Sequence, residues 1–178
     1  MNLLINTNPR QDRYSLNITL AKRLALALGG QMKMIRLYNS KQEYFNYKFN
    51  QKWIHLVKEA KVLIFPVPMW NLSIPAALKD FFDKIVKKGE LWDLDSNNRF
   101  QGLLKDTTAF IIMTSGDYYP AGHPQDFVIP YLRTLLNSLG IKDIKDFRIG
   151  GVKGNSELVS DKAFLEAKSH EMFEAFGL

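Results

Sequence analysis

Short apolar runs alternate along this chain with longer segments in which apolar residues recur every three or four positions. The first pattern is typical of buried strands and the second of amphipathic helices. Strands are predicted at 2–6, 32–37, 62–65, 107–113 and 144–149, and helices with apolar stripes at 20–28, 49–60, 78–85, 127–139 and 164–176. This alternation predicts an α/β fold of three layers, with a five-stranded parallel sheet in the order 2-1-3-4-5 and helices on both faces.

The composition narrows the class of protein. The 178 residues are 46% hydrophobic and 24% charged, which is ordinary for a globular protein and predicts one domain over residues 1–178. The absence of cysteine excludes disulfides, thiolate metal sites and cysteine catalysis, and no metal-ligand set is recognised. Because no secretory signal and no apolar run of ~18 residues is found, we expect a soluble, cytoplasmic protein without a membrane partner.

The net charge of +6 is the one unusual bulk property. Its basic residues are scattered and never form a run of five. A solvated surface is therefore favoured over a face that binds nucleic acid. A weaker hypothesis is that the positive charge attracts anionic nicotinamide cofactors.

The loop Pro68–Pro75 lies between the strand at 62–65, which Pro66 bounds, and the helix at 78–85. It contains two prolines, a tryptophan and no charged residue. A loop that faced only water would be more polar, so this one is predicted to lie against a flat, apolar group.

The loop after the first strand has a different character. It is polar, and it places Arg10, Ser15 and Asn17 just before or within the start of a helix. The first amides of a helix have no intrahelical partner and favour an anion such as phosphate. Serine and asparagine are also common helix N-caps, so the loop by itself leaves a purely structural role open.

The residues Pro-Met-Trp-Asn-Leu-Ser-Ile-Pro at 68–75, followed by Ala-Ala-Leu-Lys at 76–79 and Phe82-Asp83, carry a specific resemblance. They resemble the signature of the FMN-dependent NADH-azoreductases, flavodoxin-like proteins related to the NAD(P)H quinone reductases. The resemblance implies a flavodoxin-like fold and non-covalently bound FMN. It also implies that the loop backbone lies along the flavin ring edge, with contacts from Pro68, Met69, Trp70, Asn71 and Leu72.

Two further segments extend the resemblance. The first loop of the family commonly reads Ser-Pro-Arg and then Ser-x-Ser, and Asn8, Arg10, Ser15, Leu16 and Asn17 occupy the matching positions. The resemblance assigns them to the FMN phosphate, with asparagine in place of two serines. The loop after the fourth strand keeps Thr114, Ser115 and Gly116 and then departs from the family at Asp117, and the resemblance places these residues at the flavin pyrimidine edge.

Two features of the site region have open roles. His123, in the same loop, is either a proton donor or a turn residue, and the turn role is favoured. The long connector at 89–105 is a lid, a dimer contact or a simple surface excursion.

The resemblance implies an FMN-dependent NADH:quinone oxidoreductase or azoreductase that acts as a homodimer. NADH or NADPH would give hydride to the flavin in a ping-pong cycle, and a small aromatic quinone, azo or nitro compound would take the electrons. Trp70, Tyr118 and Tyr119 are candidate pocket walls, and no amino-acid side chain is assigned a catalytic role. The alternatives are a flavodoxin-like electron carrier, which the net charge of +6 disfavours, and an FMN-binding module without turnover.

Overall fold

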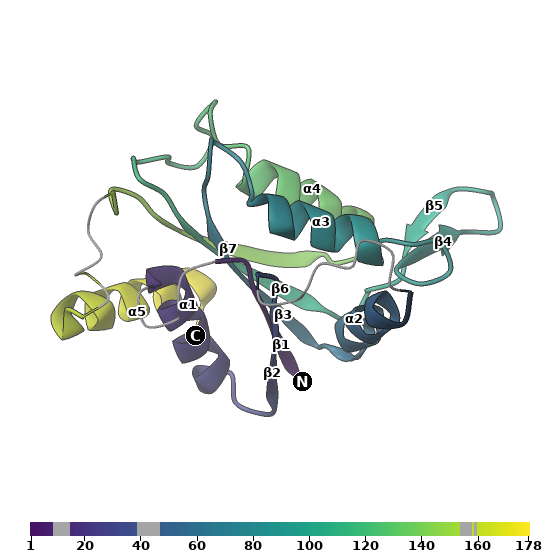
Figure 1. Ribbon diagram of the computed structural model, residues 1–178, viewed down its shortest axis with the longest axis horizontal. Coiled ribbons are helices and arrows are strands. Elements are labelled where there is room, and N and C mark those ends of the chain that lie inside the picture. Colours follow the sequence, from purple (N-terminus) through teal and green to yellow (C-terminus); the bar gives the residue numbers. More distant parts are fainter. Residues whose placement is uncertain (9–14, 39–46, 154–157, 159) are drawn as a thin grey trace.

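The computed structural model of the protein describes residues 1–8, 15–38, 47–153, 158 and 160–178, and the side chains of 47–49 are not described. Five parallel strands form one sheet in the order β2-β1-β3-β6-β7 (Figure 1). They are β1 (Asn2–Asn6), β2 (Met32–Arg36), β3 (Val62–Pro68), β6 (Thr108–Thr114) and β7 (Asp143–Ile149). Counted along the chain without the small hairpin between β3 and β6, this is the predicted order 2-1-3-4-5, so the fold prediction is confirmed. The charged strand β2 lies at an edge.

Helices cover both faces of the sheet (Figure 1). Packed on one face are α1 (Leu16–Ala27) and α5 (Lys162–Phe176), and on the other α2 (Tyr47–Glu59), α3 (Ala76–Ile85) and α4 (Ile129–Ser138). None of the helices in these described ranges combines the length and the apolar character that crossing a membrane requires.

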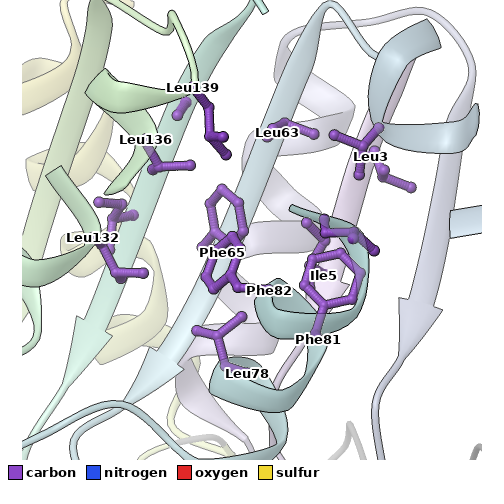
Figure 2. Close-up of a cluster of buried hydrophobic side chains, with 14 of the residues drawn as sticks. Leu3, Ile5, Leu63, Phe65, Leu78, Phe81, Phe82, Leu132, Leu136 and Leu139 are labelled. Atoms are coloured by element: carbon purple, nitrogen blue, oxygen red, sulfur yellow. The ribbon is translucent and has the colours of Figure 1, made fainter. Parts of the chain in front are cut away.

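The core is divided in two by the sheet because successive strand residues point to opposite faces. In β1, Leu3 and Ile5 face the cluster under α2, α3 and α4, whereas Leu4 faces the cluster under α1 and α5. Figure 2 shows the larger cluster, with Phe65 of β3 among leucines of α4 and phenylalanines of α3. Burying one such side chain stabilises the fold by roughly 1.5–3 kcal/mol.

Strand β3 extends beyond the predicted boundary at Pro66 and ends at Pro68. The Met69 N–H donates to the Thr114 carbonyl of β6 at 2.7 Å. Since N–H groups alternate sides along a strand, the two proline nitrogens face β1, whose register with β3 stops at Ile64. Both prolines therefore fall where no N–H is needed. Beyond the last β1–β3 pair, which is Leu4 with Ile64, the Thr7 hydroxyl donates to the Pro66 carbonyl at 2.6 Å.

The connector at 89–105 contains an antiparallel hairpin of β4 (Trp92–Leu94) and β5 (Phe100–Gly102). Its base is attached where the sheet strands begin, because the Leu104 N–H donates to the Leu139 carbonyl just before β7. The site loops follow the ends of β1, β3 and β6, at the opposite edge. The hairpin therefore lies away from the site loops of its own chain (Figure 1).

Candidate functional site

The three unusual loops of the sequence meet at the carboxyl edge of the sheet. They follow β1, β3 and β6, which are adjacent in the sheet. The chain leaves β1 toward β2 at one side and then returns to β3 at the other side, so the sheet reverses its order between β1 and β3. Ligands of open α/β sheets bind in the crevice at such a reversal point, and the β1–β3 pairing ends at Ile64, before this edge is reached.

Four of the predicted site residues form one chain of hydrogen bonds. Asn8 Nδ2 donates to Ser15 Oγ at 2.8 Å, and Ser15 Oγ donates to Asn17 Oδ1 at 2.6 Å. Asn17 Nδ2 then donates to Thr114 Oγ1 at 3.2 Å. Ser15, Asn17 and Thr114 are buried, so these bonds join the loop after β1 to the end of β6 without competition from water.

The start of α1 combines a buried side-chain network with an uncapped first turn. Ser15 is the N-cap residue, but its side chain makes no capping bond because it bonds Asn17 instead. The first-turn amides, including those of Leu16 and Asn17, have no intrahelical acceptor, and together with the helix dipole they favour an anion. The Leu16 side chain is buried in the core under α1, so this residue offers its backbone. Arg10 lies outside the described residues.

The loop after β3 is a tight turn with strained geometry. Trp70 and Ser73 exchange two backbone hydrogen bonds, each of 3.0 Å. Between them Asn71 and Leu72 have φ angles of +48° and +67°, as a type I′ turn requires. Asparagine tolerates this region, but a leucine there is an outlier, and such strain clusters at ligand-contacting sites.

The loop after β6 is held on both sides. Met69 N–H donates to the Thr114 carbonyl at 2.7 Å, and Ser115 N–H donates to the Ile149 carbonyl at 3.0 Å. The Ser115 hydroxyl bonds the Asp117 carbonyl at 2.8 Å, so the backbone turns sharply at Gly116. Asp117 itself is exposed.

Close packing beside this loop requires a glycine after β7. A Cβ on Gly150 would lie 2.8 Å from Tyr118 Cα and 2.9 Å from the Asp117 oxygen. Both are backbone atoms that could move only with the whole loop. The predicted site residues described by the structure thus lie on three loops joined to one another, and Gly150 is a supporting residue that sequence reasoning missed.

Partly exposed aromatic residues lie on the loops at this edge. The rings of Tyr38, just after β2, and Trp70 have centroids 6.2 Å apart and are tilted by 59°. They are 38% and 42% exposed, and Tyr118 is 72% exposed. Partial burial raises the pKa of Tyr38, so its phenol stays protonated at neutral pH. Sequence reasoning missed Tyr38 because it begins a segment without clear periodicity.

His123 lies in a turn, as favoured from the sequence. Its N–H bonds the Pro120 carbonyl at 3.1 Å, and its carbonyl accepts from Asp126 N–H at 2.9 Å. Its Nδ1 accepts from the Gln125 N–H at 3.2 Å, and its ring lies edge-on to Tyr119 at 5.1 Å. These contacts show that the residue forms part of a turn.

Residues 2–171 match the model of a protein family described by its flavodoxin-like fold. Among curated relatives, an FMN-dependent NADH:quinone oxidoreductase from Beijerinckia indica is 38% identical over 105 residues, which are 58% of this chain and 51% of that protein. An enzyme of the same name, numbered 1, from Trichormus variabilis is 34% identical over 115 residues, or 65% and 53% of the two chains. The chain spans about half the length of these relatives.

The solved structures show the same fold. An FMN-dependent NADH-azoreductase from Bacillus anthracis, in complex with FMN, superposes with a TM-score of 0.81 at 22% identity and covers 99% of this chain and 97% of that one. An NAD(P)H:quinone oxidoreductase from Methanothermobacter marburgensis has a TM-score of 0.69 at 16% identity, with 99% and 97% covered.

Proposed function

The chain belongs to the family of proteins with the flavodoxin-like fold, and on that premise we propose that it is an FMN-dependent NAD(P)H oxidoreductase that reduces quinones or azo or nitro aromatic compounds. The names of its relatives support this proposal, since those that match at 34–38% identity are FMN-dependent NADH:quinone oxidoreductases. The observation that carries it is the hydrogen-bonded chain from Asn8 to Thr114, which joins the loop after β1 to the end of β6. The bond from the Met69 N–H to the Thr114 carbonyl adds the loop after β3, so three loops are united at the reversal point of the sheet.

The phosphate of FMN would bind at the start of α1. The Ser15 hydroxyl is engaged with Asn17, and one N–H of the Asn17 amide is engaged with Thr114. We therefore assign the phosphate chiefly to the first-turn amides of α1, which include those of Leu16 and Asn17, with Arg10 as the cationic partner. The side chains of Asn8, Ser15 and Asn17 would hold the loop in shape around it.

The flavin ring edge would lie along the turn after β3. Within the described residues, the amides of Asn71 and Leu72 make no hydrogen bond to another backbone group, so both are available as donors. Pro68, Met69 and Trp70 would complete this contact. On the other side, Thr114, Ser115, Gly116 and Asp117 would surround the pyrimidine edge, where a turn at glycine lets the backbone approach closely.

Bound FMN would supply the hydride chemistry between NADH or NADPH and the aromatic acceptor, and the protein would supply orientation and electrostatics. Trp70, Tyr118 and Tyr119 would form walls of the acceptor pocket, and Tyr38 joins them because its ring contacts Trp70. Aromatic walls favour planar aromatic acceptors through stacking. The protonated Tyr38 phenol could donate a hydrogen bond to an acceptor oxygen.

An electron carrier of the same fold is not favoured. Such carriers usually have an acidic surface, whereas this chain carries a net charge of +6. The relatives named above are enzymes, which also disfavours a module that binds FMN without turnover. The homodimer, the cytoplasmic location and the extent of the single domain stay predictions.

The test is the visible absorption spectrum of the purified protein with FMN, before and after anaerobic addition of NADH and of NADPH. We expect protein-bound flavin bands that bleach with at least one donor and return when a quinone is added. A protein that takes up no FMN would contradict the whole proposal. Uptake of FMN without bleaching by either donor would support FMN as the cofactor but would contradict the proposed NAD(P)H oxidoreductase activity.

A further inference from the structure

The conformation of Leu72 needs contacts that hold it in place. Its φ of +67° is rare for a leucine, and such conformations persist only where the surroundings over-determine them. Besides the Trp70–Ser73 pair within the turn, the part of the chain that the structure describes contributes one hydrogen bond to Leu72 from outside the turn. In it the Phe127 N–H donates to the Leu72 carbonyl at 3.2 Å. The turn therefore depends on the placement of the backbone just before α4.

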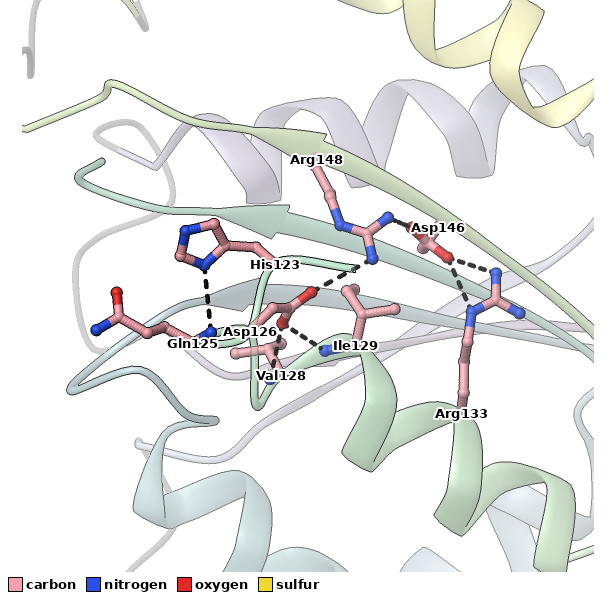
Figure 3. A network of polar contacts seen from close by, with 8 residues as sticks. All are labelled: His123, Gln125, Asp126, Val128, Ile129, Arg133, Asp146 and Arg148. Carbon is pink, nitrogen blue, oxygen red and sulfur yellow. Dashed lines mark hydrogen bonds and ion pairs between the residues drawn. The ribbon is translucent and has the colours of Figure 1, made fainter. Parts of the chain in front are cut away.

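That backbone is positioned by Asp126. Its Oδ1 accepts from the amides of Val128 and Ile129 at 3.0 and 3.1 Å. These bonds bracket Phe127, which lies between Asp126 and Val128 in the chain. Its Oδ2 faces Arg148 at 3.3 Å, as Figure 3 shows. Because the Asp126 side chain is only 1% exposed, these charge-assisted contacts are stronger than they would be in water. They fix the direction of the Phe127 N–H.

Arg148 is positioned by Asp146 of β7, which is itself bonded to Arg133 of α4. It pairs with Asp146, two residues earlier on the same strand, and Asp146 accepts a 2.9 Å hydrogen bond from Arg133 Nε of α4 (Figure 3). Arg148 Nε is buried and has no hydrogen-bond partner among the described residues. The orientation of its guanidinium therefore depends on the two carboxylates, Asp126 and Asp146.

We propose that Asp126 and Arg148 are positioning residues that clamp the turn at Leu72 through the Phe127 N–H. Neither side chain needs to contact the flavin. The clamp holds a strained backbone in the shape that presents the Asn71 and Leu72 amides, and its effect on the cofactor rests on the FMN site proposed above. Arg133 and Asp146 form the outer part of the network, which also fastens α4 to β7.

The matched variants are Arg148→Met and Arg133→Met. Each removes one guanidinium from Asp146, but only the first removes the contact to Asp126. Amide hydrogen exchange measured by NMR without flavin gives the first readout. We expect the Ser73 and Phe127 amides to exchange about tenfold faster in Arg148→Met, and at nearly the native rate in Arg133→Met. Equal rates in the two variants would overturn the proposal.

The second readout is FMN affinity in a double-mutant cycle with Leu72→Gly. Arg148→Met is expected to weaken FMN binding about tenfold in the native background, because a small displacement of a binding group is costly. Glycine adopts a positive φ without strain, so in the Leu72→Gly background the same change should have little effect. Purely additive effects would contradict the clamp.

If Arg148→Met does not fold, Asp126→Asn replaces it, because the asparagine oxygen still accepts from Val128 and Ile129 while the charge that attracts Arg148 is lost. If the native protein binds no FMN, the proposed function fails, whereas the exchange rates of Ser73 and Phe127 still decide the clamp.

Discussion

Asn17 of α1 donates a hydrogen bond to the Thr114 hydroxyl at the end of β6, across 97 residues of chain. Both side chains are buried, and β3 lies between the strands whose loops they join. The bond therefore joins the start of α1, where the FMN phosphate is proposed to bind, to the loop after β6, which is proposed to contact the pyrimidine edge. It passes beyond the end of β3, which lies between them. Loops that would otherwise move independently become one site.

Replacing Asn17 with alanine tests this coupling. The change leaves the Ser15 hydroxyl without its acceptor and Thr114 without its donor in a buried place, so we expect a loss of about 1–3 kcal/mol of unfolding free energy. Urea denaturation measures it, and fluorescence titration should show weaker FMN binding. Asn137→Ala, on the exposed surface of α4, is the control. Equal stability of the two variants would argue against the coupling.

Gly150→Ala is expected to displace the loop that contains Asp117 and Tyr118. The new Cβ would lie 2.8 Å from Tyr118 Cα, and overpacking of this kind costs about 1–3 kcal/mol. Thermal unfolding measures the loss. Gly116→Ala is the control for stability, since its Cβ would meet Lys153 Cβ at an ordinary 3.5 Å. If both substitutions lower the melting temperature equally, the close approach at Gly150 is not the cause.

Phe100→Ser tests the position of the β4–β5 hairpin. Phe100 is 51% exposed and stacks on Trp92, at the sheet edge opposite the site. We therefore expect an unchanged FMN dissociation constant and an unchanged rate of flavin reduction by NADH. Analytical ultracentrifugation of the same variant asks whether this apolar tip is a dimer contact. An FMN affinity that falls with Phe100 would contradict the placement of the hairpin away from the site.

The ion pair between Glu90 and Lys58 should make stability depend on pH in the acidic range. Hydrogen bonds from Lys58 and then Gln51 lower the pKa of Glu90 below its ordinary value. A lowered carboxyl pKa stabilises the fold above the unfolded-state pKa, and this contribution is lost as the pH falls through the lowered pKa. For a surface pair it amounts to about 0.2–1 kcal/mol. Urea midpoints between acidic and neutral pH should fall less steeply for Glu90→Gln than for the native protein, and parallel curves would contradict this.

The order of the elements and the three site loops could be predicted from local patterns. The spacing of apolar residues indicated each helix and each strand of the five-stranded sheet, because burial against a sheet imposes a period on the residues themselves. It did not indicate the β4–β5 hairpin. The strand before Pro66 was predicted too short, since a proline normally excludes a central strand. It is tolerated in β3 because the missing N–H faces the side on which pairing with β1 has already ended.

Sequence by itself determined the parallel α/β fold and its strand order, because these follow from periodicity. The residues proposed to meet a flavin also come from the sequence, through a motif contiguous in the chain. Only the tertiary structure decided which polar side chains bond one another. Asn17 and Thr114, or Asp126 and Arg148, are partners because sheet order and helix packing bring distant residues together and leave their buried polar groups no water to bond. Tyr38 likewise lies beside Trp70 because the ends of β2 and β3 meet at the same edge of the assembled sheet. The β4–β5 hairpin lies away from the site because its base is attached where the strands begin. Both placements depend on the assembled sheet and not on neighbouring residues in the chain.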